Sequence, residues 1–156
     1  ARAALAATEA AQQALLASLP QAELLRTLPG FGPVVIATLL GELGNLADYA
    51  HPQQAVRMAG LNVVSDNSGK FQGPTRLAKR GRPQARQILY QAALVAIAHE
   101  GPARARYREL RARLAPKAAL MALACKLLRI AWACVRQQTP YDVRRAFARS
   151  TSAAAA

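Results

Sequence analysis

The chain has 156 residues, which is enough for one compact domain and too few for two ordinary ones. Alanine occupies 37 positions and aromatic residues make up only 5% of the chain, so the composition excludes an all-β architecture, because strands favour aromatic and β-branched side chains. The formal net charge of +13 indicates a polyanionic partner, and the lack of an uncharged apolar run of about 18 residues argues against a membrane span.

The first third of the chain reads as short helices separated by proline and glycine. Residues 2–19 predict a helix with a poor apolar stripe, so we expect residues 1–20 to be the end of a linker or coiled-coil helix. Two further helices, 21–28 and 34–43, flank Pro29-Gly30-Phe31-Gly32-Pro33, and Gly44 suits the position just past the second. Another short helix is predicted over 53–59.

Residues 61–81 have turn chemistry and no helical period, so they predict either an ordered loop or a small hairpin. Helical patterns then resume over 83–99, 103–114, 117–137 and 141–149, and residues 150–156 are expected to be a disordered tail. The expected core faces consist of Ile88, Leu89, Ala92, Val95 and Ala96 on one helix and Leu120, Ala124, Leu127, Leu128, Ala131 and Val135 on the longest. We therefore predict an all-α fold, a helix-hairpin-helix followed by a small helical bundle with one long ordered loop.

The basic residues are concentrated in the second part of the chain. Residues 1–66 contain three basic and five acidic side chains, whereas residues 67–156 contain 18 basic and three acidic ones. A one-sided basic field of this kind is typical of nucleic-acid binders. The alternative is a solvated basic face without a partner. A membrane surface is not expected, because the basic segments lack bulky aromatic anchors.

The first candidate site is the helix-hairpin-helix predicted at 22–43. Gly30 and Gly32 would let the backbone approach a phosphate, while amides at the start of the second helix point at the anion. Phe31 would turn inward and lock the hairpin to both helices. Such contacts read the DNA backbone and carry no base information. The alternative is a plain helical hairpin that serves packing alone.

The second candidate site is a serine on a glycine-flanked segment among cations. Ser68 would be the nucleophile, and nearby basic residues would stabilise charge that develops on a phosphoryl group. These cations are Lys70, Arg76, Lys79, Arg80, Arg82 and Arg86. The alternative is an ordinary Ser-Gly turn. His51 and His99 read as helix-end residues, and the acids are too scattered for a metal site, so no metal ligand is predicted.

The two cysteines give an indication of the compartment. Cys125 and Cys134 lie nine residues apart in one predicted helix, on opposite faces, so they cannot form a disulfide with each other within it. Free cysteines are typical of a reducing cytoplasm, and we expect a cytoplasmic, nucleoid-associated protein.

The order of several short motifs resembles the C-terminal domain of transposases of the insertion sequence one-ten family. The resemblance runs from about Leu24 to Asp142. Its motifs are "Leu-Pro-Gly-Phe-Gly-Pro", "Arg-Met-Ala-Gly-Leu", "Ser-Gly", "Leu-Ala-Lys-Arg-Gly", "Gln-Ile-Leu-Tyr-Gln-Ala-Ala-Leu" and "Ala-Cys-Lys-Leu-Leu-Arg-Ile". The ordered series is far more specific than any single motif. It implies that residues 21–149 are a C-terminal transposase domain.

The resemblance also implies a mechanism. In the family an N-terminal RuvC-like domain supplies four acids that bind Mg²⁺, and the C-terminal serine attacks DNA to form a phosphoserine link, guided by a structured RNA. The matching serine is Ser68, although Ser65 lies three residues earlier and Asn62-Val63 replaces the usual Ala-Pro or Thr-Pro. We therefore expect DNA, a guide RNA and further copies of the protein as partners, no cofactor in this chain, and no cleavage by it alone.

These observations favour DNA binding and strand cleavage or exchange in transposition. Two alternatives remain at this stage. The first is a non-catalytic helix-hairpin-helix module of a repair or recombination protein, and the second is an interaction domain that binds RNA alone.

Overall fold

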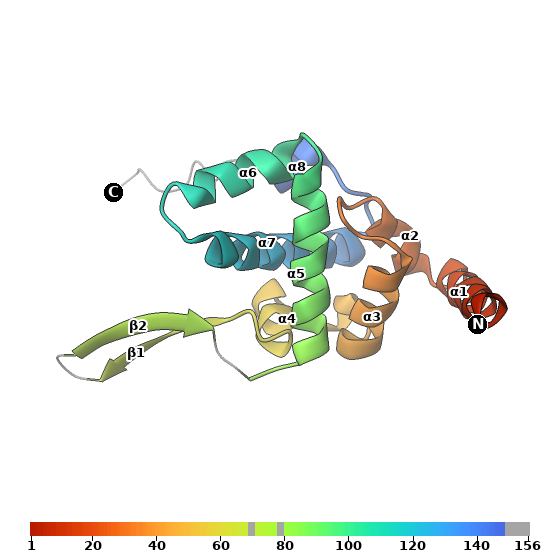
Figure 1. Cartoon of the computed structure of the whole chain (residues 1–156), viewed down its shortest axis with the longest axis horizontal. Helices are drawn as coiled ribbons and strands as arrows, with labels where there is room; N and C mark the ends of the chain where they lie inside the picture. Colours follow the sequence, from red (N-terminus) through yellow and green to blue (C-terminus); the bar gives the residue numbers. More distant parts are fainter. Residues whose placement is uncertain (69–70, 78–79, 149–156) are drawn as a thin grey trace.

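The computed structural model describes residues 1–68, 71–77 and 80–148, and for 63–68 and 71–76 it describes the backbone alone. Most of this part of the chain is helical, as predicted. The elements in chain order are α1 (Arg2–Ala17), α2 (Pro20–Arg26), α3 (Pro33–Leu43), the 3-10 helix η1 (Leu46–Asp48), α4 (Pro52–Met58), β1 (Val63–Ser68), β2 (Phe71–Leu77), α5 (Pro83–Ala98), α6 (Pro102–Arg111), α7 (Pro116–Gln137) and α8 (Val143–Ala146) (Figure 1).

The all-α class is confirmed for the body of the molecule, with one addition. The segment predicted as a long ordered loop or a small hairpin is an antiparallel hairpin, β1 paired with β2. It projects from the helices instead of packing flat against them (Figure 1). A bulge between Ser65 and Asn67 interrupts the ladder, so the pairing register shifts partway along it.

Proline marks the start of most helices. It occupies the first or second position of α2, α3, α4, α5, α6 and α7. Proline is favoured there because its missing N–H has no partner in the first turn and its φ is already helical. Gly44 follows α3 with φ of 70°. The predicted start and end of α3 are therefore confirmed.

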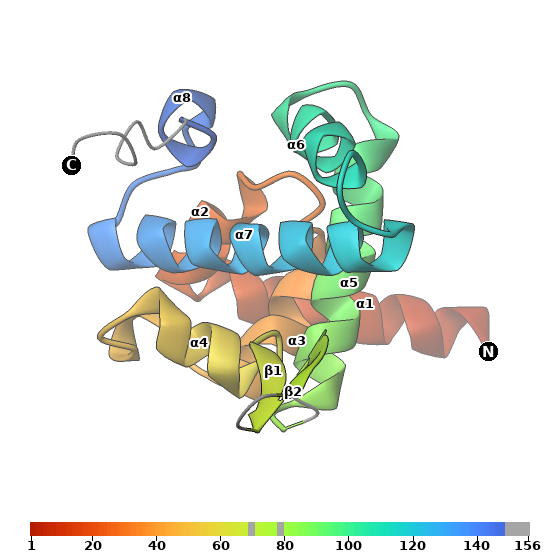
Figure 2. The same ribbon diagram turned by 90° about the vertical axis from the view of Figure 1, so that its left-hand side faces the viewer.

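Helix α7 is the centre of the core. It packs against α2, α4, α5 and α6, and Figure 2 shows it crossing the molecule with α4 on one side and α6 and α8 on the other. All six predicted core residues of this helix are buried: Leu120, Ala124, Leu127, Leu128, Ala131 and Val135. By length and composition α7 could cross a membrane, but 56% of its most apolar window is buried inside the domain.

Helix α5 crosses α7 and packs on α3. Its buried residues are Ala85, Leu89, Ala92, Ala93 and Ala96, so the prediction that Val95 belongs to the core is wrong. Val95 is 52% exposed. The small alanine side chains, and not the larger valine, face the neighbouring helices, because alanine lets two helices approach closely.

Hydrogen bonds join the segment after α3 to α7. Trp132 Nε1 donates to the Tyr49 carbonyl at 2.8 Å, and an Arg136 guanidinium N–H donates to the Ala47 carbonyl at 2.8 Å. The Tyr49 hydroxyl donates to the Leu43 carbonyl at 2.7 Å. These bonds hold the link between α3 and α4 against the central helix.

The two ends of the described chain contribute little to the core. Of the residues of α1, Leu16 alone is buried. At the other end, the helix predicted over 141–149 is wrong in extent, because α8 spans only Val143–Ala146, a single turn that begins where the Asp142 side chain accepts the Arg144 N–H. The tail predicted at 150–156 lies outside the described residues.

Candidate nucleic-acid interface

The turn between α2 and α3 carries the first candidate site, and its two glycines differ. Gly30 has φ of 80°, a left-handed conformation, and a Cβ built on it would collide with the backbone carbonyl oxygen of Ala92 on α5. Close packing between the turn and α5 therefore accounts for this glycine. Phe31 is buried, as predicted.

Gly32 faces open space. It is the residue before Pro33 at the start of α3, has ordinary extended backbone with φ of −82°, and a Cβ on it would have no neighbour within 4 Å. The first amides of a helix have no partner within the helix, so this end of α3 is the part of the turn that an anion could approach. Phosphate contact at Gly30, Phe31 and Gly32 stays a prediction.

The hairpin carries the second candidate site. Ser68 is the last residue of β1 and pairs with Phe71. This pair lies at the end of the ladder opposite the foot of the hairpin, where Val63 pairs with Leu77. Ser65 pairs with Thr75, on the other side of the bulge, and Arg76 pairs with Val64 near the foot. Lys70 and Lys79 lie outside the described residues. The backbone positions therefore place the two candidate serines at different points of the ladder, on opposite sides of the bulge.

The foot of the hairpin is held by a close crossing of two chain segments. The Arg82 N–H donates to the Met58 carbonyl at 2.7 Å, and an Arg86 guanidinium N–H donates to the Gly60 carbonyl at 3.5 Å. A Cβ on Gly81, whose φ is 117°, would lie 2.5 Å from the Gly60 nitrogen. This contact fixes where the chain returns from the hairpin to α5.

The predicted stripe of Arg82, Arg86 and Tyr90 is only partly a free surface. Arg82 is exposed at the start of α5, whereas Arg86 is half-buried against Gly60 and Tyr90 packs partly buried against the core. Arg80 is also exposed. Of the predicted cations whose side chains are described, Arg80 and Arg82 are therefore the two most accessible to a ligand.

The structure brings no metal-ligand set together among the residues it describes, where no three His, Cys, Asp or Glu side chains form a group. His51 precedes α4, whose Gln54 side chain accepts the N–H groups of Ala50 and His51, and His99 follows the end of α5. Cys125 and Cys134 are free thiols, as predicted, and burial raises the pKa of each. The described residues therefore do not fit a Mg²⁺ site.

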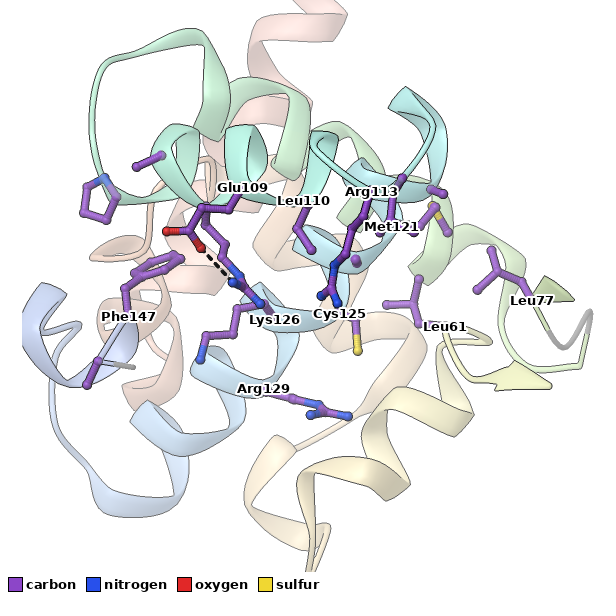
Figure 3. Close-up of a pocket in the computed structure, with 17 residues that line it drawn as sticks. Leu61, Leu77, Glu109, Leu110, Arg113, Met121, Cys125, Lys126, Arg129 and Phe147 are labelled. Carbon is purple, nitrogen blue, oxygen red and sulfur yellow. Dashed lines mark hydrogen bonds and ion pairs between the residues drawn. The ribbon is translucent and has the colours of Figure 1, made fainter. Parts of the chain in front are cut away.

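One feature near these sites was missed by sequence reasoning. A groove of about 1070 Å³ lies between α6 and α7, and it extends from Leu61 and Leu77 at the foot of the hairpin to Phe147 after α8 (Figure 3). Basic side chains line it together with apolar ones. No single stretch of sequence signals this groove, because its lining comes from five separate stretches of the chain.

Comparison with known proteins shows which family this domain belongs to. The family model described as "Transposase IS116/IS110/IS902 family" matches residues 22–108, which is more than half of the chain. The chain belongs to this transposase family. The match runs from α2 into α6, so it includes the glycine turn, the hairpin and α5.

Two curated relatives agree with this assignment. One is "Insertion element IS116 uncharacterized 44.8 kDa protein" of Streptomyces clavuligerus, 30% identical over 119 residues, which are 76% of this chain and 30% of the relative. The other is "Insertion element IS900 uncharacterized 42 kDa protein" of Mycobacterium paratuberculosis, 30% identical over 122 residues, which are 77% of this chain and 31% of the relative. The chain thus spans about a third of the length of these relatives, and its own family membership supports a transposition-related role.

Proposed function

We propose that this chain is the DNA-binding, serine-bearing part of an insertion-element transposase and acts in strand cleavage and exchange. The observation that carries the proposal is the position of Ser68 at the end of β1, on a hairpin that projects from a domain of a transposase family. On a projecting hairpin, a serine at the end of β1 is accessible to a DNA backbone that approaches the domain.

The chemistry implied by the resemblance is a transesterification. The Ser68 hydroxyl attacks a DNA phosphorus, a serine–phosphate ester forms, one phosphodiester P–O bond breaks, and the departing sugar oxygen takes up a proton. Cations near the phosphate favour this step because negative charge develops on the phosphoryl oxygens. Arg80 and Arg82 are exposed, but they follow β2 at the foot of the hairpin, at the opposite end of the ladder from Ser68, so their role in this step also stays a prediction. The roles of Lys70, Arg76, Lys79 and Arg86 stay predictions.

A divalent metal would have to be held elsewhere in the protein. The resemblance implies Mg²⁺ bound by acids of another domain, and the described residues of this chain bring no such acids together. The chain by itself is therefore proposed to bind DNA without cutting it. A guide RNA and self-association stay predictions.

The proposed role of Ser68 is tested by Ser68→Ala in a protein of the relatives' full length that contains this chain. We expect strand cleavage and any covalent protein–DNA adduct to be lost, with duplex affinity changed less than about twofold, because a nucleophile acts only in the chemical step. The measurements are recombination of a donor and a target plasmid, mass spectrometry of trapped adducts, and fluorescence anisotropy of DNA binding.

Ser65→Ala is the matched control, because Ser65 lies in the same strand on the other side of the bulge. It should retain activity. An adduct that maps to Ser65, or full activity of the Ser68→Ala protein, would overturn the assignment of the nucleophile. Normal DNA binding with no adduct in any variant would favour the non-catalytic DNA-binding module, which the family match does not favour.

A further inference from the structure

The groove between α6 and α7 is a second concave surface, separate from the strands that carry Ser68. One wall is α6 and the turn after it, with Leu110 and Arg113, and the other is α7, with Met121, Cys125 and Lys126 (Figure 3). The family match ends at residue 108, so the α7 wall lies beyond it. The groove therefore needs an explanation of its own.

The charges in the groove are strongly one-sided. Four cations line it, Arg106, Arg113, Lys126 and Arg129, against a single carboxylate, Glu109. Glu109 is engaged by Arg106, whose guanidinium nitrogen lies 2.8 Å from Glu109 Oε2. Arg129 donates to the Gln53 side-chain oxygen at 2.8 Å, which leaves its charge uncompensated. Arg113 and Lys126 make no ion pair with a carboxylate among the residues whose side chains the structure describes.

The concentration of positive charge in the groove affects the pKa of Lys126. Burial lowers the pKa of its ammonium group, and the nearby charges of Arg106 and Arg129 lower it further. Its ammonium nitrogen lies 5.9 Å from the centre of the Phe147 ring, a cation–π contact that compensates only part of the charge. A bound anion would relieve this repulsion.

The apolar part of the lining narrows the kind of anion. Leu110, Leu114 and Met121 line the groove together with the cations, and Phe147 lies at one end of it. A free phosphate would leave these side chains uncovered, and a DNA duplex keeps its base faces stacked inside, exposing its charged backbone and the base edges in its grooves. A single strand offers both chemistries at once, phosphates for cations and base faces for apolar and aromatic side chains.

We propose that the groove between α6 and α7 binds a single strand of DNA, with its phosphates near Arg113, Lys126 and Arg129 and its bases over the apolar lining. Leu61 and Leu77 line the end of the groove at the foot of the hairpin. A strand that leaves the groove there continues toward β1 and β2. This goes beyond the role proposed for Ser68, because it assigns a strand-holding surface distinct from the nucleophile.

Protection of Cys125 tests the proposal directly in this chain. Cys125 is half-buried and lines the groove, whereas Cys134 is buried in an adjoining pocket, so the reference is alkylation of Cys125 in the same protein without DNA. Because burial raises the pKa of both thiols, alkylation is followed at a pH of about 9, where thiolate forms more readily. The probe is a DNA single strand of about 12 nucleotides, and the readout is mass spectrometry of N-ethylmaleimide adducts.

We expect a saturating single strand to slow alkylation of Cys125 at least about fivefold relative to the protein without DNA, and a blunt duplex of the same sequence to have little effect. Unchanged alkylation of Cys125 while the single strand is bound would overturn the proposal. Protection by an RNA strand of the same sequence, without protection by DNA, would overturn the choice of DNA. Duplex binding in any of these cases leaves the proposed role of the hairpin standing.

Charge variants give an independent test. The double variant Arg113→Gln and Lys126→Gln removes the two groove cations that form no ion pair with a carboxylate whose side chain is described. It should weaken single-strand binding about tenfold, as measured by fluorescence anisotropy. Arg104→Gln with Arg108→Gln is the control, since it also removes two charges from the α6 region, both paired with Glu100 and outside the groove lining. An equal loss in both double variants would show general charge attraction and contradict a specific site.

Discussion

Gly30 and Gly32 lie two residues apart in one turn but have different surroundings. At Gly30 the left-handed backbone and the Ala92 carbonyl leave no room for a side chain. At Gly32 the backbone is extended and its surroundings are open. The same residue type therefore serves packing at one position and leaves the end of α3 accessible at the other.

Gly30→Ala should destabilise the domain by about 2–4 kcal/mol, because a methyl group adds backbone strain and pushes the turn away from α5. The measurement is the free energy of unfolding from urea denaturation monitored by circular dichroism. Gly32→Ser is the control and should change stability by less than about 0.5 kcal/mol, because serine is a good residue before a helix. Equal losses at the two positions would contradict the difference in packing.

At the scale of elements, α3 combines a structural and a recognition role. Its buried side chains Ile36, Leu39 and Leu43 hold it in the core, while its first turn begins at the open Gly32. A helix held by its interior and open at its start can offer unpaired amides to an anion without moving. DNA affinity at this end can therefore be altered without altering the core.

Gly32→Asp and Gly32→Asn test contact between this end of α3 and phosphate. Both residues are favourable before a helix, so α3 should stay folded in both proteins. The aspartate charge should repel DNA and lower duplex affinity about three- to tenfold relative to asparagine, as measured by fluorescence anisotropy at low salt. Equal affinity of the two variants would show that the turn serves packing alone.

Sequence patterns predicted the elements that local chemistry determines. Pro33 and Gly44 gave the bounds of α3, and the apolar period of α7 gave its buried face. The pattern failed at Val95 because it placed this valine on the face of Leu89, Ala92 and Ala96, whereas Ala93 completes the buried face of α5 and Val95 lies outside it. It also could not supply the strand register, which depends on a partner strand, or the groove, whose walls meet only in the folded chain.

At the scale of the whole molecule, the basic charge has few acidic partners. The ion pairs between side chains of the described residues use the carboxylates of Glu23, Glu100 and Glu109, all at the surface. Exposed pairs of this kind add little stability. Most of the 21 basic residues are thus left for solvent or for a polyanion.

Binding of this chain to duplex DNA should therefore depend strongly on salt and little on sequence. If about six phosphates are neutralised, the logarithm of the affinity should fall with the logarithm of salt concentration with a slope of about −5. The measurement is fluorescence anisotropy between about 50 and 200 mM salt with two duplexes of unrelated sequence. An affinity that does not change over this range would contradict the proposal that phosphates are the main contacts.

The central position of α7 has a consequence for synthesis of the protein. Residues 1–115 leave the ribosome before this helix does, and until it follows, α2, α4, α5 and α6 lack the element against which they pack. Such uncovered apolar faces attract chaperones, proteases and other unfinished chains. The domain is protected from proteases and aggregation only after α7 has been synthesised and has packed against the other helices. Synthesis of α7 therefore determines when a new chain can complete its core.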